Sequence, residues 1–251
     1  MQTEKDAPNL MQWAGEREPR AWMIENLFYS FPLSRLPGSR YLKKVCDAMP
    51  VPIREEHRTH YMTLRTQGLG QEERLAMDEP PDEPTVLAAE HPSAILKHHE
   101  TAGSDDRLLS ASNYVVGDQC IDIVSQPHHD AMSEAVSEYM GQPAWQQGHF
   151  FYPPGAFRGW HTNQYSPSGW RMYIVVASEA NRSFFRLKHP DTGEIITVWD
   201  HGQTVNFFHV VRGKPLYHCV ASETDRWSAG FLVPDNWRSI IARHERQAAL
   251  V

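Results

Sequence analysis

The second half of the chain alternates short apolar runs with turn-forming residues. The separators contain proline, glycine and aspartate, as in Pro153-Pro154-Gly155 and Asp200-His201-Gly202. Short runs at this spacing are typical of antiparallel β domains. We predict eight strands, at residues 147–152, 158–163, 171–177, 183–187, 194–199, 204–210, 216–220 and 226–233. This number favours a two-sheet jelly roll over a parallel α/β sheet.

The first half has a different pattern and is predicted to support this core. Apolar residues recur at helical spacing in His129–Met140, which predicts a helix that ends at Gly141. Less regular stretches predict two further helices and two strands, respectively at Ala21–Tyr29, Ser39–Met49, Thr59–Leu64 and Tyr114–Val124. Residues 71–92 are acidic and rich in proline, which predicts a surface loop or a lid.

We therefore predict a mainly β fold with flanking helices. Residues 1–141 would form a helical and loop-rich support region of the same domain, and residues 142–251 the jelly-roll catalytic core. The helices would cover one sheet from outside.

The composition of the chain excludes some classes of partner but does not identify a function. The chain has 251 residues, 41% of them hydrophobic, so it can bury the core of a single domain. A net charge of −7 argues against nucleic acid as a partner. No apolar run approaches the ~20 residues of a membrane span, so no membrane partner is expected. The polar N-terminus and the three distant cysteines predict a cytoplasmic protein, and the 14 histidines justify a search for a metal site.

Two histidines on separate predicted strands are the candidate metal ligands. Side chains two apart on a strand share a face, so His161 and Asn163 can point into the barrel together, and His218, on a separate strand, can supply a third direction. Two histidines and a carboxylate, with open positions, form the usual non-haem Fe(II) site. Asn163 stands where the carboxylate is expected, and its amide oxygen is neutral and a weaker donor. A single histidine in an apolar strand is more often a core residue.

Arg226 and Ser228 also share a strand face and follow soon after His218. A guanidinium binds a carboxylate through paired hydrogen bonds, and a hydroxyl can add a third. They could hold the far end of a diacid chelated at the metal, which describes 2-oxoglutarate. Taken alone, Arg226 would be assigned to a salt bridge within the sheet.

Residues 147–233 resemble the Fe(II)- and 2-oxoglutarate-dependent oxygenases, most of all the prolyl-hydroxylase branch. The family's tyrosine–proline–glycine entry to its first metal histidine reads here Tyr152-Pro153-Pro154-Gly155. Further similarities are an arginine-led strand from Arg171, paired phenylalanines before the second histidine, and a final arginine, aromatic and small residue at Arg226-Trp227-Ser228.

The resemblance implies a cupin-like fold and a set of roles. His161 and His218 would bind Fe(II), and Tyr152, Arg226 and Ser228 would hold the cosubstrate 2-oxoglutarate. With O2, the enzyme would hydroxylate a small-molecule or amino-acid-like substrate. The departure is Asn163, where most of the family has aspartate or glutamate. Asn163 would ligate the metal through its amide, or leave a position for water or for chloride.

Three hypotheses follow from these residues. The first is a hydroxylating dioxygenase. The second is a halogenase-type variant of the same scaffold, ranked lower because asparagine is bulkier than the glycine or alanine of those enzymes. The third is a catalytically silent jelly-roll protein that binds a sugar or an organic acid. A zinc hydrolase is disfavoured because no general-base carboxylate is evident near the histidines.

Overall fold

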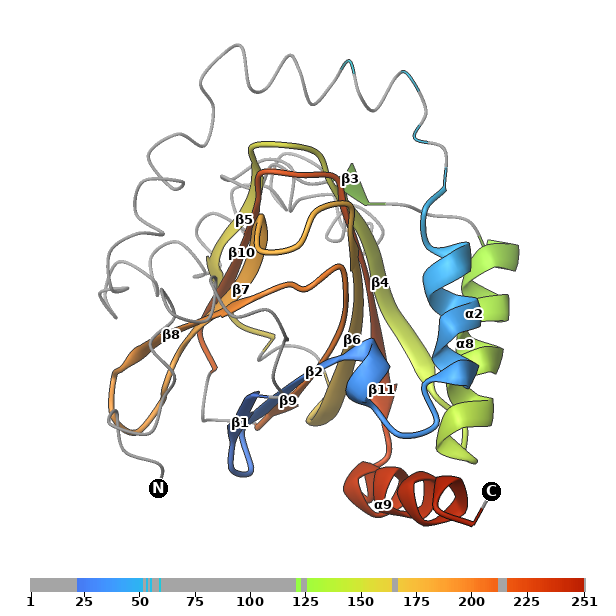
Figure 1. The fold of residues 1–251 in the computed structure, drawn as a ribbon. Helices are drawn as coiled ribbons and strands as arrows, with labels where there is room; N and C mark the ends of the chain where they lie inside the picture. Colours follow the sequence, from blue (N-terminus) through green and yellow to red (C-terminus); the bar gives the residue numbers. More distant parts are fainter. Residues whose placement is uncertain are drawn as a thin grey trace.

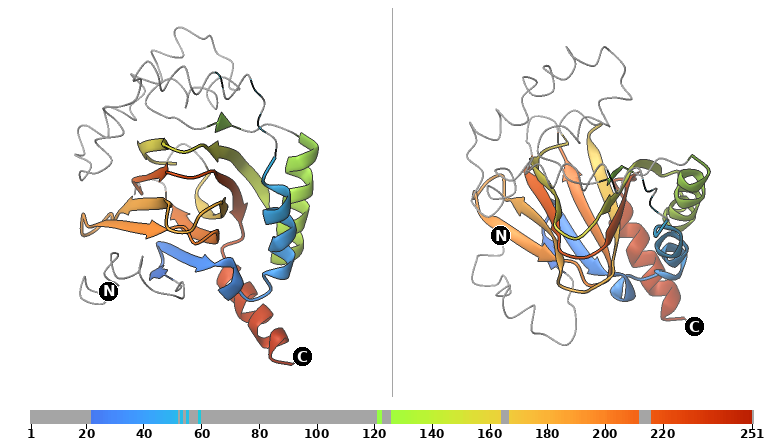
Figure 2. Two further views of the ribbon diagram at one scale, coloured as in Figure 1. Left: turned by 45° about the horizontal axis from the view of Figure 1, so that its top comes forward. Right: turned by 90° about the horizontal axis from the view of Figure 1, so that it is seen from above.

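The computed structural model describes residues 22–51, 53, 55, 59, 121–122, 126–163, 167–211 and 216–250. Within them, two antiparallel sheets face each other, and helices lie against the outer side of the larger sheet (Figures 1 and 2). The fold is a jelly roll, or double-stranded β-helix, as predicted.

The larger sheet has seven strands in the order β1-β2-β9-β6-β11-β4-β3. Their bounds in this order are Trp22–Ile24, Phe28–Pro32, Gln203–Val210, Gly169–Ala177, Arg226–Val233, Trp145–Tyr152 and Ile121–Asp122. The smaller sheet has four strands in the order β5-β10-β7-β8, with bounds Ala156–His161, His218–Ser222, Ser183–Lys188 and Ile195–Trp199. The eight predicted strands are β4 to β11, with ends that agree to within two residues.

Within the described residues, three helices accompany the sheets, together with the short 3-10 helix η1 (Leu33–Arg35). Helix α2 (Arg40–Ala48) and helix α8 (Gln126–Met140) confirm two of the predicted helices. The apolar positions of α8 face inward: Met132, Val136 and Tyr139 are buried. They belong to a core cluster that joins the helices to the larger sheet, so the helices cover that sheet from outside, as expected.

The alternation along β9 explains how this sheet is buried on both faces. Val205 and Phe207 point toward the helices and belong to the outer core cluster. Phe207 stacks on Trp237 of helix α9 (Trp237–Ala248), with ring centroids 4.0 Å apart. Asn206 and Phe208 point the other way, into the space between the sheets, where both line a cavity. Because β9 is covered on both sides, its sequence lacks the regular polar alternation of a half-exposed strand.

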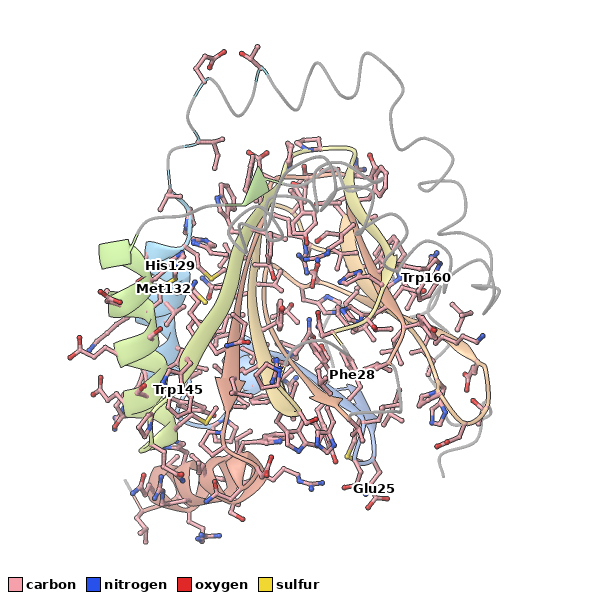
Figure 3. All side chains as sticks on the ribbon, turned by 180° about the vertical axis from the view of Figure 1, so that it is seen from behind. Glu25, Phe28, His129, Met132, Trp145 and Trp160 are labelled. Atoms are coloured by element: carbon pink, nitrogen blue, oxygen red, sulfur yellow. The ribbon has the colours of Figure 1, made fainter. Side chains whose placement is uncertain are left out.

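Aromatic side chains fill part of the space between the two sheets. Phe28 of β2 is labelled in Figure 3. Its ring stacks on that of Phe185 of β7 with centroids 5.2 Å apart, and the Phe185 ring lies 5.6 Å from that of Phe208. These rings belong to a second core cluster that takes residues from both sheets. They fix the sheet separation beside the cavity described below.

The predicted helix at Ala21–Tyr29 is wrong. This stretch forms the hairpin of β1 and β2, and Asn26 lies in its turn at φ 59°, a conformation that asparagine tolerates. Strand β2 then pairs with the edge of β9, so β-sheet pairing outweighs a weak helical pattern. Helix α9 was not predicted, although its buried positions Trp237, Ile240 and His244 have helical spacing.

Several predictions concern stretches that the structure describes only in part. Apart from Thr59, the predicted strand Thr59–Leu64 lies outside the described residues, as does the loop at 71–92. Of the strand predicted at Tyr114–Val124, the described part is β3. No helix in the described ranges is both long and apolar enough to span a membrane.

Candidate functional site

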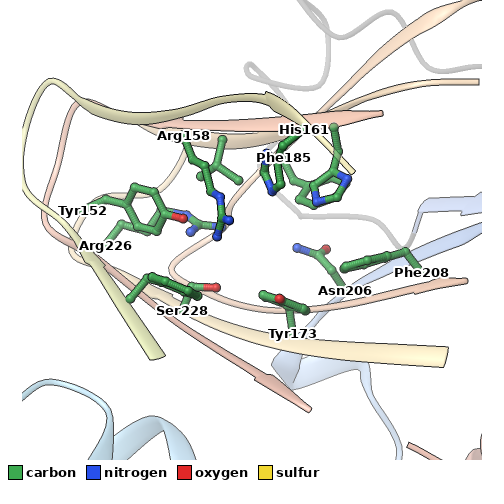
Figure 4. A pocket seen from close by; sticks show the side chains of 12 residues that line it. Tyr152, Arg158, His161, Tyr173, Phe185, Asn206, Phe208, Arg226 and Ser228 are labelled. Atoms are coloured by element: carbon green, nitrogen blue, oxygen red, sulfur yellow. The ribbon is translucent and has the colours of Figure 1, made fainter. Parts of the chain in front are cut away.

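A cavity lies between the two sheets (Figure 4), and both sheets contribute to its wall. Aromatic rings, two imidazoles and two guanidinium groups meet there. Its lining consists of Phe150, Tyr152, Arg158, His161, Tyr173, Phe185, Asn206, Phe208, His218, Val220, Arg226 and Ser228. Five of the six residues proposed from the sequence are in this set.

The two candidate histidines meet on the smaller sheet. His161 ends β5 and His218 begins β10, and the two residues are partners in the antiparallel register. Their ring centroids are 4.2 Å apart, with an angle of 55° between the planes. Two side chains from distant parts of the sequence are thus close enough for a single cation to contact both rings.

The surroundings of His218 determine its protonation. Nδ1 lies 2.9 Å from the carbonyl oxygen of Leu216, and because a carbonyl can only accept, Nδ1 carries the hydrogen. The pKa of His218 is lowered from 6.5 to about 4, mainly by burial; the Leu216 hydrogen bond opposes this change and the charge of Arg158 contributes to it. The imidazole is therefore neutral near pH 7, with its lone pair on Nε2. This is the form that binds metal ions.

Arg226 combines a structural contact with an unused donor. Its Nε donates to Asp200 Oδ2 at 2.8 Å, and Ser183 Oγ donates to the same oxygen at 2.6 Å. The salt bridge considered from the sequence is therefore present. The guanidinium lies over the ring of Tyr152, 5.1 Å from its centroid. Its Nη1 is buried and has no hydrogen-bond partner among the described residues.

An anion is the group that this arrangement lacks. Asp200 binds the guanidinium through Nε, so Nη1 is available to a ligand in the cavity. Ser228, two residues along the same strand, also lines the cavity. Tyr152 faces Arg226 across β4 and β11. A buried donor without an acceptor is unfavourable, and a ligand carboxylate would supply that acceptor.

Arg158 also lines the cavity, and alternation along a regular strand does not predict this. Its partner is Val220, whereas His161 pairs with His218, so β5 has one extra residue at a bulge. Because of this bulge, Arg158 and His161 both line the cavity although they are three positions apart. Burial raises the pKa of Tyr173, and the charge of Arg158 acts against that rise. Arg158 is therefore close to both Tyr173 and His218.

Asn163 is the sequence candidate that the structure does not bring to this cavity. It follows the end of β5, is half-buried, and is not among the lining residues. Asn206, which the sequence analysis did not single out, lines the cavity from the larger sheet. No motif marks Asn206. Its only signal was a polar residue between Val205 and the phenylalanine pair Phe207-Phe208.

The donors present fit a metal ion only in part. Nowhere in the described ranges do three His, Cys, Asp or Glu side chains gather as a metal site would require. The cavity offers two imidazoles, of which that of His218 is neutral with its lone pair on Nε2. Imidazole is a good ligand for iron and for other divalent transition metals, so the pair fits such an ion while the third protein ligand is undefined.

No protein-family model matches the sequence, and no curated protein matches it. Several solved structures have a similar fold. A 2-oxoglutarate–Fe(II) oxygenase family oxidoreductase from Burkholderia pseudomallei is 14% identical with a TM-score of 0.32, over 47% of this chain and 67% of that one. A prolyl-4-hydroxylase from Pseudomonas putida is 18% identical with a TM-score of 0.30, over 47% and 72%.

A third similar structure is a prolyl hydroxylase from Trichoplax adhaerens, solved with a peptide fragment of the oxygen degradation domain of hypoxia inducible factor. It is 13% identical with a TM-score of 0.33, over 60% of this chain and 78% of that one. At these identities the case for a function rests on the side chains that line the cavity.

Proposed function

We propose that the chain is an Fe(II)- and 2-oxoglutarate-dependent dioxygenase that hydroxylates an unactivated C–H bond of a small-molecule or amino-acid-like substrate. One observation carries the proposal. The cavity contains the adjacent pair His161 and His218 and, from the opposite sheet, the buried Nη1 of Arg226 without an acceptor. A metal ion and a carboxylate would satisfy these two sets of groups together.

The residues proposed from the sequence then have definite roles. His161 and His218 hold the metal through their imidazole nitrogens. Arg226 donates through Nη1 to the distal carboxylate of 2-oxoglutarate, and Ser228 adds a hydroxyl donor. Tyr152 packs on the Arg226 guanidinium and keeps it directed along the cavity. Asn163 is the third metal ligand predicted from the sequence, and that role stays a prediction.

The iron, once bound, would supply the oxidising chemistry by which dioxygen and 2-oxoglutarate yield succinate, carbon dioxide and a hydroxylated product. The protein contributes position and exclusion of water. Phe185 stacks on His218 at 5.1 Å and 18°, and Phe208 lies 5.3 Å from the same ring. This aromatic enclosure limits the rotation of the imidazole and keeps the cavity apolar around the reacting C–H bond.

Two alternatives rest on the same missing carboxylate. A binding protein without catalysis is favoured by the absence of a third acidic or thiol ligand in the described part of the chain. A halogenase-type variant would use the position that a carboxylate normally occupies for chloride. Product analysis with and without chloride separates the second alternative from hydroxylation, and the first predicts no succinate at all.

The decisive experiment is an anaerobic Fe(II) titration in the presence of 2-oxoglutarate, followed through the metal-to-ligand absorption band. We expect the band with the wild type and its loss in His161→Ala and His218→Ala. His189→Ala is the matched control, because His189 lies in the turn after β7 and outside the cavity. An absorption band that persists in both cavity variants would refute the proposal.

A further inference from the structure

Asn206 is a buried amide with an unused acceptor inside the cavity. It lies in the middle of β9, paired with Ser30 of β2 and Tyr173 of β6, and is 1% exposed. Its Oδ1 has no hydrogen-bond partner among the described residues. An apolar side chain at this position would avoid the cost of an unsatisfied buried amide, so the amide calls for a ligand that is not part of the sheet.

The position of Asn206 is opposite the histidine pair. Phe208, the next inward residue on β9, lies 5.3 Å from the His218 ring between centroids. Asn206 is therefore one inward position away from a side chain that packs against His218, about 7 Å along the strand. Its amide points into the cavity, toward the side where His161 stands (Figure 4).

Two groups at this end of the cavity present lone pairs. His218 Nδ1 carries the hydrogen, so Nε2 presents a lone pair, and Asn206 Oδ1 presents another. Two acceptors cannot satisfy each other. A cation satisfies both, and first-row divalent metals accept imidazole nitrogen together with amide oxygen.

We propose that Asn206 Oδ1 is the third protein donor to the metal ion held by His161 and His218. This inference rests on the proposed metal site and assigns its third ligand to the opposite sheet, in place of Asn163. All three protein donors are then neutral. The metal keeps its full charge, which a dianionic cosubstrate would neutralise.

The test is an anaerobic Co(II) and Fe(II) titration of the full-length chain without cosubstrate. Asn206→Asp replaces a neutral donor with a carboxylate of the same shape, and we expect it to tighten the metal at least tenfold at pH 8. Asn206→Leu removes the donor and should loosen it at least tenfold. The matched pair Asn163→Asp and Asn163→Leu should stay within twofold of the wild type. The visible spectrum of bound Co(II) should change only in the Asn206 variants.

The stability of the metal-free variants distinguishes a ligand role for Asn206 from a merely structural one. Asn206→Leu removes an unsatisfied buried amide, so the metal-free variant should unfold at a temperature equal to or above that of the wild type, although it binds metal more weakly. Unchanged metal affinity in both Asn206 variants, or a tenfold effect in the Asn163 pair, would overturn the inference. If His161→Ala and His218→Ala also left affinity unchanged, the metal site itself would fail, so the two failures are distinguishable.

Discussion

Replacing Arg226 with methionine should have two separable effects, one on the fold and one on cosubstrate binding. The side chain is 1% exposed and forms an ion pair with Asp200, which is equally buried. Methionine leaves that carboxylate without its cation, and loss of one member of a buried pair costs about 3–5 kcal/mol. Ser183 Oγ still donates to Asp200, which favours the lower end of this range. At about 2–4 °C per kcal/mol, the melting temperature should fall by roughly 6–20 °C.

The second effect concerns 2-oxoglutarate. Removal of the Nη1 donor should weaken its binding by about 2–5 kcal/mol, the usual cost of truncating a buried charge pair. At about 1.4 kcal/mol per tenfold change, this is roughly a 30-fold to 4,000-fold rise in Kd. Calorimetric titration of the metal-loaded protein, under anaerobic conditions and well below the melting temperature, measures the affinity.

A second substitution separates the two effects. Adding Asp200→Leu removes the stranded carboxylate, so Arg226→Met/Asp200→Leu should recover most of the lost thermal stability. It should recover none of the cosubstrate affinity, because the donor is still missing. Arg182→Met is the control for the loss of one positive charge, since Arg182 is exposed in the turn before β7. Wild-type affinity in Arg226→Met, or full recovery of affinity in the double variant, would show that Arg226 is only a structural ion-pair residue.

Two further predictions concern His218 and Gly230. The pKa of His218 is lowered from 6.5 to about 4 by burial, so between these pH values the unfolded chain binds a proton that the folded chain does not. Above pH 6.5 His218 is neutral in both states, so this difference does not reduce the free energy of unfolding. As the pH drops from 6.5 to 4, it lowers the free energy of unfolding by about 3 kcal/mol. Urea unfolding from pH 4 to 8 should show a shallower dependence in His218→Phe, and an unchanged slope would contradict the assignment. In Gly230→Ala, the new Cβ would lie 2.5 Å from a ring carbon of Tyr173. We expect a loss of about 1–3 kcal/mol and a displaced Tyr173, measured by unfolding and tyrosine fluorescence. Wild-type stability there would show that the ring moves freely.

The eight core strands could be predicted from the sequence because turn-forming residues separate most of the apolar runs. Proline or glycine lies in five of the seven connections between β4 and β11, and the apolar residues of α8 have regular helical spacing. The hairpin of β1 and β2 was misassigned because its stability comes from pairing with β9, a contact between residues far apart in the sequence. Local pattern carries no information about such a partner.

In the candidate site, too, the features set by local spacing were predictable and those set by strand pairing were not. Residues two apart on a regular strand, such as Arg226 and Ser228, were correctly expected to share a face. The same rule overlooked Arg158 because it assumes a strand without bulges. It placed Asn163 beside His161 because it assumed that the strand continues, whereas β5 ends at His161. The register shift opposite Val220 lies exclusively in the pairing of β5 with β10, and so could not be read from either strand alone.

The cavity offers both acceptor and donor atoms, and a single bound species would have to satisfy both kinds. At one end His218 and Asn206 offer lone pairs. At the other end Arg226 Nη1 offers a hydrogen. A lone cation would satisfy the first set and be repelled by the guanidinium, and a lone anion would satisfy only the second. A cation chelated by a molecule with a distal carboxylate satisfies both, which is why the two ligands are expected to bind together more tightly than either binds alone.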